Sequence, residues 1–259
     1  MITRGEINEY AKTFGMKPWQ LEKDYFQHIL LHLIYSNTSS LVFKGGTAIK
    51  KAYGLRRFSE DLDFTQVGEI ELDTFFEKIS KELSEKFGYD NEVKKIKIKT
   101  ELGTSYRFAI NGPLLEPGGL GYCYIYIEIS KRELPKTRDI IVIKPVFADL
   151  PDYSILVMSK EEILAEKVRA IIARDRVRDL YDLWYLLSQN VKIKTDWINE
   201  KMDYYKGKKK FSVEMFSKTL TKYKKDWNDM RQLTTYVPNF NEVIKLIREK
   251  FKTAHGAEK

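Results

Sequence analysis

The sequence contains only one cysteine, Cys123, and three histidines among 259 residues. A single cysteine cannot form an intramolecular disulfide, and it cannot supply the thiolates of a Cys-rich zinc site. Three histidines are also few for a metal site built on imidazole. Any bound metal is therefore expected to have oxygen ligands.

Long apolar runs are missing as well. No stretch approaches the roughly 20 apolar residues that span a bilayer, and the N-terminal residues Met-Ile-Thr-Arg-Gly-Glu have no apolar signal core. We therefore expect a cytoplasmic protein without a membrane partner. With 43% hydrophobic and 13% aromatic residues, the chain can bury a substantial core.

Positive charge is in excess. Lys and Arg number 45 against 37 Asp and Glu, which gives a formal net charge of +8. This balance favours a polyanionic partner such as nucleic acid, although many basic proteins simply have solvated lysine faces. The lysine run Lys208, Lys209 and Lys210 is a candidate RNA contact in the C-terminal part.

The spacing of apolar residues predicts an α+β protein. Helical periodicity is found near the N-terminus, over residues 72–87, and through most of the chain after residue 159. Strands are predicted over residues 41–44, 62–65, 92–99, 105–111, 122–130 and 140–147. Pro151 and the turn at Asp152 separate the two parts. We predict a mixed sheet flanked by helices in residues 1–155, followed by a mainly helical domain in residues 156–259.

A glycine turn stands between the first predicted strand and the helix after it. Gly45 and Gly46 allow the backbone to approach a ligand closely, and the start of a helix offers unpaired N–H groups to phosphate. The hydroxyl of Thr47 adds one more donor. On its own such a step is more often an ordinary tight turn, but here two aspartates follow on the next strand.

Those aspartates, Asp61 and Asp63, are separated by one residue in a predicted strand. Successive side chains of a strand alternate in direction, so the two carboxylates share one face, about 7 Å apart along the backbone. Carboxylates at this spacing can converge on shared cations. The alternative is a solvated strand edge.

Glu128 is a candidate third carboxylate. It alternates with isoleucines and lies on the same face as three tyrosines of the segment YCYIYIEIS. If its strand neighbours that of Asp63, three carboxylates can hold Mg²⁺ ions. The alternative is a surface glutamate that pairs with a lysine on a neighbouring strand.

A second group of charged residues lies after residue 160. Lys167 has no acidic residue three or four positions away, so we expect it to be without a local partner and to reach a phosphate or extend to water. Asp179 and Asp182 are expected on one side of the next helix, where either could pair with a nearby arginine. Arg57 is expected to contact phosphate or to neutralise Glu60.

Two stretches together resemble the AbiEii/AbiGii toxin family of nucleotidyltransferases, which is related in core fold to DNA polymerase beta. They are VFKGGTAIKKAYGLRRFSEDLDF and SKEEILAEKVRAIIARDRVRDLYDLWYLL. The resemblance implies a nucleotidyltransferase-like sheet and a helical domain that closes a nucleotide cleft. It also implies the toxin of an abortive-infection or type IV toxin–antitoxin pair, with a cognate antitoxin as partner.

The resemblance further implies roles for individual residues. Gly45, Gly46 and Thr47 would hold nucleotide phosphate. Asp61 and Asp63 would bind Mg²⁺, Lys167 would contact the triphosphate, and Asp179 would complete the active site.

The implied reaction moves a nucleotide from a nucleoside triphosphate to an acceptor hydroxyl, with an RNA, such as a tRNA 3′ end, as acceptor. Two alternatives remain open at this point. A metal-dependent nuclease or phosphodiesterase would use the same carboxylates with water as nucleophile, and a non-catalytic nucleic-acid-binding module would use only the positive charge.

Overall fold

The chain divides into two compact units in the computed structural model, which describes residues 1–96, 103–116, 118, 121–204 and 210–257. The first unit comprises Met1–Ala48 and Glu60–Val157, and the second comprises Ile49–Ser59 and Met158–Lys259. The division expected at residue 155 therefore falls at residue 157, and residues 49–59 group with the second unit.

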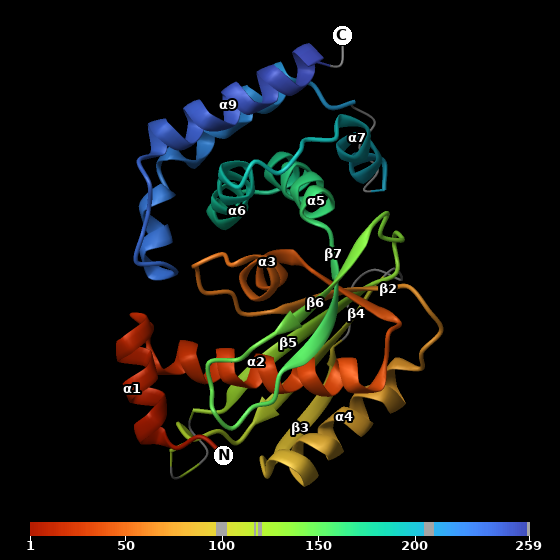
Figure 1. The fold of residues 1–259 in the computed structure, drawn as a ribbon, viewed down its shortest axis with the longest axis vertical. Helices are drawn as coiled ribbons and strands as arrows, with labels where there is room; N and C mark the ends of the chain where they lie inside the picture. Colours follow the sequence, from red (N-terminus) through yellow and green to blue (C-terminus); the bar gives the residue numbers. More distant parts are fainter. Residues whose placement is uncertain (97–102, 117, 119–120, 205–209, 258–259) are drawn as a thin grey trace. The chain divides into compact units, whose positions relative to one another are not determined.

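A seven-stranded mixed sheet forms the centre of the first unit (Figure 1). Its spatial order is β3-β4-β5-β2-β1-β7-β6. The central strand β2 runs antiparallel to β1 and parallel to β5, and β7 runs parallel to β1. The strands are β1 (Leu41–Lys44), β2 (Leu62–Gln66), β3 (Asn91–Ile96), β4 (Gly103–Ile110), β5 (Cys123–Ser130), β6 (Arg138–Ile143) and β7 (Tyr153–Met158). The predicted fold class is confirmed.

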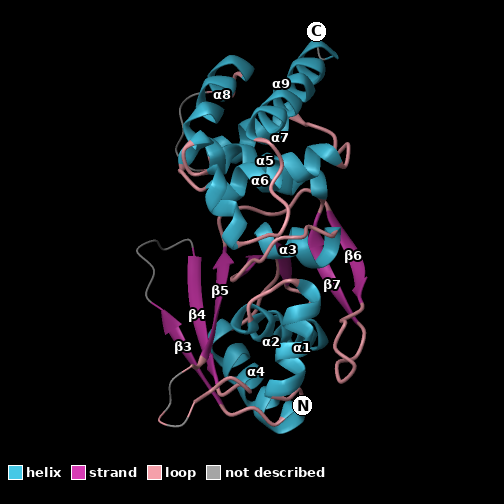
Figure 2. Cartoon of the chain, turned by 90° about the vertical axis from the view of Figure 1, so that its left-hand side faces the viewer, coloured by secondary structure: helices cyan, strands magenta, loops and turns pink. Residues whose placement is uncertain are grey.

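Three helices accompany this sheet: α1 (Arg4–Phe14), α2 (Pro18–Asn37) and α4 (Leu72–Phe87). The Thr3 hydroxyl accepts from the N–H of Glu6 while the Glu6 carboxylate accepts from the N–H of Thr3, so α1 begins with a capping box. α2 packs against β5 and α4 against β3, and Figure 2 shows α1, α2 and α4 between strands β3–β5 and strands β6–β7. The sheet face away from them can therefore carry polar groups.

The alternation of β5 separates its two faces. Cys123, Ile125 and Ile127 are buried, whereas Tyr124 and Tyr126 are exposed. Burial raises the pKa of the Cys123 thiol well above its usual range. One face of this strand therefore belongs to the core, and the other is available for function.

The turn between β1 and α3 (Gly45–Tyr53) requires glycine at its first position. Gly45 has φ of +79°, a conformation that L side chains rarely adopt. A Cβ at this position would also collide with the carboxylate of Asp63. The bare backbone therefore allows the start of α3 to lie against the aspartate of the neighbouring strand.

Sequence reasoning missed β7. The segment was expected to be a turn that leads into the helical part, because Pro151 and Asp152 precede it. Tyr153, Ile155 and Val157 are buried and alternate with less buried residues, which is the period of a strand. β7 lies between β1 and the edge strand β6, and Val157 pairs with Phe43. The predicted strand over residues 92–99 extends into residues 97–99, which lie outside the described residues.

The second unit is helical. α5 packs against α6 and α7, and α6 packs against α9 (Figure 1). The Ser159 hydroxyl caps α5 by accepting from the N–H of Glu162. The helices are α5 (Lys160–Ala173), α6 (Val177–Ser188), α7 (Thr195–Asp203), α8 (Val213–Thr219) and α9 (Phe240–Ala257), with 3-10 turns at Leu220–Lys224 and Trp227–Gln232. Among the described residues, no helix is both long and apolar enough to cross a membrane.

Replacement of Gly45 by alanine should destabilise the protein more than the same change at Gly54. Both glycines have φ of +79°, so both alanines carry the left-handed backbone cost of about 1–2 kcal/mol. Only at Gly45 does the new Cβ collide with a carboxylate; at Gly54 its nearest neighbour is the Tyr185 hydroxyl at 3.3 Å. Overpacking adds about 1–3 kcal/mol. Urea unfolding followed by circular dichroism checks this, and equal losses would contradict the proposed close approach.

Candidate functional site

The strand register of the first unit lines up three charged residues. Asp63 of β2 pairs with Lys44 of β1 on one side and with Glu128 of β5 on the other. Directly paired residues project from the same face of a sheet. Glu128 was expected to join the site if its strand neighbours that of Asp63, and that condition is met.

The start of α3 lies beside this row, because Gly45 follows Lys44 directly. The fully buried Thr47 hydroxyl donates to the backbone carbonyl of Asp61 at 2.5 Å. A hydroxyl has one proton to donate, so Thr47 holds the segment before β2 in place. The direct phosphate contact expected of this hydroxyl would need a different conformation. The N–H groups of Gly45 and Gly46 in the first turn of α3 remain the candidate phosphate donors.

Asp61 immediately precedes β2 and is partly buried, as is Asp63. With Glu128 they form a set of hard oxygen donors, which suits Mg²⁺ by chemistry. The structure brings Asp63 and Glu128 into register but does not complete a triad. Within the described ranges, no group of three or more Asp, Glu, His or Cys side chains is gathered closely enough to hold a metal ion.

A buried ion pair supports one end of the row. The Nζ atom of Lys44 lies 3.7 Å from Oε1 of Glu133, whose side chain is fully buried. Sequence reasoning missed both residues. A signal was present, because a lysine that ends the buried run Leu-Val-Phe in β1 must have a buried partner or reach a ligand.

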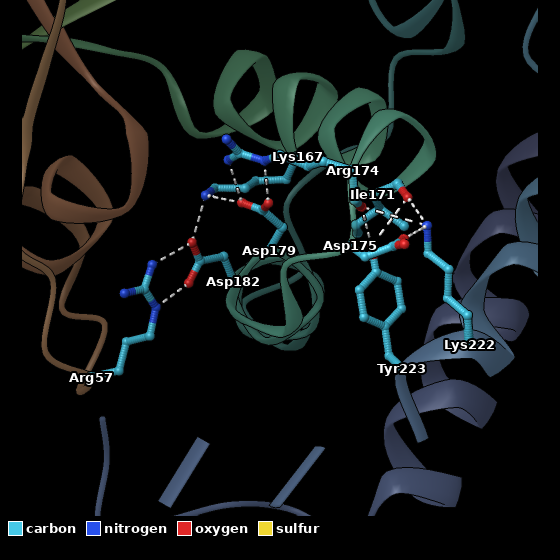
Figure 3. Close-up of polar contacts among 9 residues, drawn as sticks. All are labelled: Arg57, Lys167, Ile171, Arg174, Asp175, Asp179, Asp182, Lys222 and Tyr223. Atoms are coloured by element: carbon cyan, nitrogen blue, oxygen red, sulfur yellow. Dashed lines mark hydrogen bonds and ion pairs between the residues drawn. The ribbon is translucent and has the colours of Figure 1, made fainter. Parts of the chain in front are cut away.

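A charge cluster of five side chains forms a separate feature of the second unit (Figure 3). Its members are Arg57, Lys167, Arg174, Asp179 and Asp182. Lys167 Nζ lies 2.8 Å from Asp179 Oδ1 and 2.7 Å from Asp182 Oδ2. Arg57 donates to both carboxylate oxygens of Asp182, with Nε at 2.5 Å and Nη2 at 2.7 Å. Arg174 Nε donates to Asp179 Oδ2 at 2.8 Å.

These contacts add to one expectation and correct another. Lys167 was expected to lack a partner three or four positions away, and the two aspartates that it contacts come from the next helix and not from its own. Arg57 was expected to contact phosphate or Glu60. Its side chain is 1% exposed, two of its donors bind Asp182, and a third binds the carbonyl of Phe58 at 2.8 Å, while Glu60 pairs with Lys23 at 3.2 Å.

The cluster holds all its members in their charged forms. Burial alone would raise the pKa of Asp182, but Arg57 and Lys167 outweigh it and hold that pKa below its usual value. Lys167 and Arg174 act in the same way on the pKa of Asp179. Burial would lower the pKa of Lys167, but Asp182 and Asp179 raise it. The cluster is therefore a fixed structural link between α5, α6 and the 49–59 segment.

Sequence reasoning did not identify Arg174 as a cluster member. Arg174 directly follows α5, and its side chain reaches the first turn of α6. This contact depends on the sharp turn between the two helices and not on a spacing along one helix. It also missed a second buried pair, Lys201 of α7 with Glu162 of α5, at 2.6 Å. Lys208 and Lys209, the candidate RNA contacts, lie outside the described residues, and Lys210 is exposed.

The substitution Asp182→Asn should destabilise the second unit by about 3–5 kcal/mol, because it leaves Arg57 and Lys167 buried without one of their counter-charges. The folded-state pKa of Asp182 lies below its unfolded value of about 3.9, so its stabilising contribution is complete above about pH 5 and is lost as the pH falls through the folded pKa. The unfolding free energy should therefore fall more steeply from pH 5 to pH 3 in the wild type than in the variant.

Urea unfolding followed by tryptophan fluorescence measures this effect, because Trp184, Trp197 and Trp227 all belong to the second unit. Glu214→Gln is the control, since Glu214 pairs with Lys218 at 2.7 Å on an exposed helix face. The control should show no measurable change. An Asp182→Asn variant as stable as the control would show that the cluster is not a stabilising link.

Solved structures with the same fold include proteins from Mycobacterium tuberculosis and Helicobacter pylori. MenT4, a nucleotidyltransferase toxin from Mycobacterium tuberculosis, is 18% identical with a TM-score of 0.70, over 98% of this chain and 90% of that one. A candidate nucleotidyltransferase from Helicobacter pylori is 21% identical with a TM-score of 0.62, over 93% and 97%. JHP933 from Helicobacter pylori is 20% identical with a TM-score of 0.54, over 92% of each chain. At these identities the likeness establishes the fold.

A family model extends the comparison from fold to family. A search of curated proteins finds no match. The model described as the nucleotidyl transferase AbiEii toxin of type IV toxin–antitoxin systems matches residues 29–253. This range includes the β1–β2 carboxylates and the α5–α6 charge cluster, the two stretches on which the sequence resemblance rested. The chain thus belongs to the AbiEii family of nucleotidyltransferase toxins, as the resemblance indicated.

Proposed function

We propose that this nucleotidyltransferase moves a nucleotide from a nucleoside triphosphate to a hydroxyl of RNA, with Mg²⁺ as cofactor. The observation that carries the proposal is the pairing of Asp63 with Glu128 next to the first turn of α3. Carboxylates bind divalent cations, and backbone N–H groups at a helix start bind phosphate. A nucleoside triphosphate with its metal presents both chemistries at once.

Asp63, Glu128 and Asp61 are the residues that would hold Mg²⁺. When bound, the metal would neutralise charge on the triphosphate and lower the pKa of the attacking hydroxyl. Gly45 and Gly46 would donate backbone N–H groups to phosphate oxygens. The absence of a Cβ at Gly45 leaves room for the Asp63 carboxylate beside the backbone N–H groups that would bind phosphate.

The proposed reaction forms a bond between the acceptor oxygen and the α-phosphorus and breaks the bond from that phosphorus to the bridging oxygen of the β-phosphate. Pyrophosphate leaves, and the hydroxyl proton passes to solvent. The chain's own residues contribute position and charge, which supply most of the catalysis of this class of reaction.

RNA is proposed as the acceptor because the protein carries a net charge of +8 and a hydroxyl acceptor is required. A tRNA 3′ end is the acceptor that the family resemblance favours, and the protein would encounter tRNA in the cytoplasm. Membership of a type IV toxin–antitoxin family also implies a cognate antitoxin.

The substitution Asp63→Asn should abolish transfer and leave the fold intact, since it removes a negative charge from a proposed metal ligand that is only partly buried, and keeps the size of the side chain. The assay incubates the protein with each labelled nucleoside triphosphate, Mg²⁺ and either total RNA or tRNA, and measures label in RNA. Asp90→Asn is the matched control, because Asp90 is an exposed aspartate directly before β3.

Three results would refute parts of this proposal. Near-wild-type transfer by Asp63→Asn would defeat the metal assignment. Fragmented RNA would indicate the nuclease reaction. RNA binding without any turnover would indicate a binding module.

Lys167 is proposed to contact the triphosphate through the third donor of its ammonium group, because its two ion pairs use the other two. Lys167→Ala should then weaken triphosphate binding about 10-fold to 150-fold and spare monophosphate binding, since only the triphosphate carries the outer phosphates. Calorimetric titration with both nucleotides in Mg²⁺ measures the affinities, and urea unfolding measures stability. Equal losses for both nucleotides, together with lower stability, would restrict Lys167 to the charge cluster.

A further inference from the structure

Three tyrosines form an exposed strip that the proposed chemistry does not use. Tyr122 directly precedes β5, and Tyr124 and Tyr126 follow on the same face; we call these three residues the tyrosine face. They are 37%, 40% and 38% exposed. Tyr122 and Tyr124 have ring centroids 6.1 Å apart. The opposite face of the same strand is buried under α2, so these rings are not needed for the core.

The tyrosine face leads to the candidate catalytic carboxylates. Tyr126 is two residues from Glu128 on the same side of β5, which is about 7 Å along a strand. Glu128 is in register with Asp63. A chain that lies along the tyrosines therefore has its end directed to the proposed site of transfer.

Basic residues on the adjoining strands border the tyrosines. Arg107 of β4 pairs with Tyr126, and its guanidinium carbon lies 5.2 Å from the ring centroid of Tyr124. The buried Nε atom of Arg107 has no hydrogen-bond partner among the described residues. Lys94 of β3 pairs with Arg107 and is exposed; its ammonium lies 2.8 Å from the exposed Glu92. Positive charge beside the rings favours an anionic occupant.

Aromatic rings with flanking cations on an open sheet face match the chemistry of single-stranded RNA. Unpaired bases stack on aromatic side chains, and arginine and lysine bind the phosphates between them. Paired bases are already stacked in a helix and do not offer their faces. An acidic peptide would use the cations but would leave the three rings exposed to water.

We propose that the tyrosine face binds the unpaired end of the acceptor RNA, with bases stacked on Tyr122, Tyr124 and Tyr126 and a phosphate contacted by Arg107. This inference rests on the proposed function for the direction of the strand towards Asp63 and Glu128. The binding itself does not depend on turnover.

The test measures binding of a fluorescein-labelled single-stranded RNA of 12 nucleotides by anisotropy, with the full chain and without nucleotide. Tyr124→Ala and Tyr126→Ala should each weaken binding about 5-fold to 150-fold, whereas Tyr124→Phe and Tyr126→Phe keep the ring and should stay within about twofold. Tyr204→Ala is the matched control, because Tyr204 is a tyrosine 47% exposed at the end of α7. It should bind like the wild type.

Two further measurements sharpen the result. A fully paired RNA duplex of the same length should bind equally to the wild type and to both alanine variants. Arg107→Gln should lower the slope of log affinity against log salt by about one, which is the loss of one phosphate contact. Wild-type affinity of both alanine variants for single-stranded RNA would overturn the proposal, and so would equal losses for single strand and duplex.

The outcomes also separate this proposal from the proposed function. Asp63→Asn should keep single-stranded RNA binding while it loses transfer. Tyrosine-dependent RNA binding by a wild-type protein that transfers no nucleotide would refute the proposed function and support the tyrosine face. If neither Tyr124→Ala nor Tyr126→Ala changed the KM for RNA or the kcat of transfer, the proposal for the tyrosine face alone would be refuted.

Discussion

The position of β2 between β1 and β5 is the constraint on which the candidate catalytic row depends. Leu62 and Phe64 of β2 are fully buried, and each alternates with a residue of the opposite face. A shift of one residue would move Asp63 onto the core face and remove both apolar side chains from it, so the hydrophobic core fixes the register. The core therefore determines that Asp63 faces Glu128. This arrangement of Lys44, Asp63 and Glu128 requires no special backbone beyond Gly45, which makes room for the Asp63 carboxylate.

One short stretch of sequence serves both units. Residues 41–48 and 60–66 belong to the first unit and supply β1, the start of α3 and Asp63, whereas residues 49–59 belong to the second unit and supply Arg57. In the second unit, Arg57 neutralises Asp182, which in turn contacts Lys167. Arg57, which suggests phosphate binding when read as sequence, therefore has a structural role in the charge cluster.

The fold class could be predicted because it depends on local patterns: alternation in β2 and β5, and glycines between β1 and α3. The pairing of Asp63 with Glu128 could be predicted only on the condition that their strands are neighbours, because strand order leaves no local signal. The partners of Lys167 could not be predicted, because Asp179 and Asp182 both lie on α6, and ion pairs between elements leave no spacing in the sequence. β7 was missed for a different reason. The alternation of apolar residues typical of a strand was present in β7. Pro151 and Asp152, which directly precede it, were interpreted as the end of the sheet unit.

The single cysteine gives the sheet a natural chemical reporter. Cys123 is buried on the face of β5 that α2 covers, and burial raises the pKa of its thiol. Disulfide reagents react with thiolate, so the folded protein should react with them only during transient separation of β5 from its covering helix. The rate of thiol exchange then measures how often the centre of the sheet opens. Because the chain has one cysteine, the measured exchange rate comes from Cys123 alone. Cys123 lies on the same strand as Glu128, which projects from the other face.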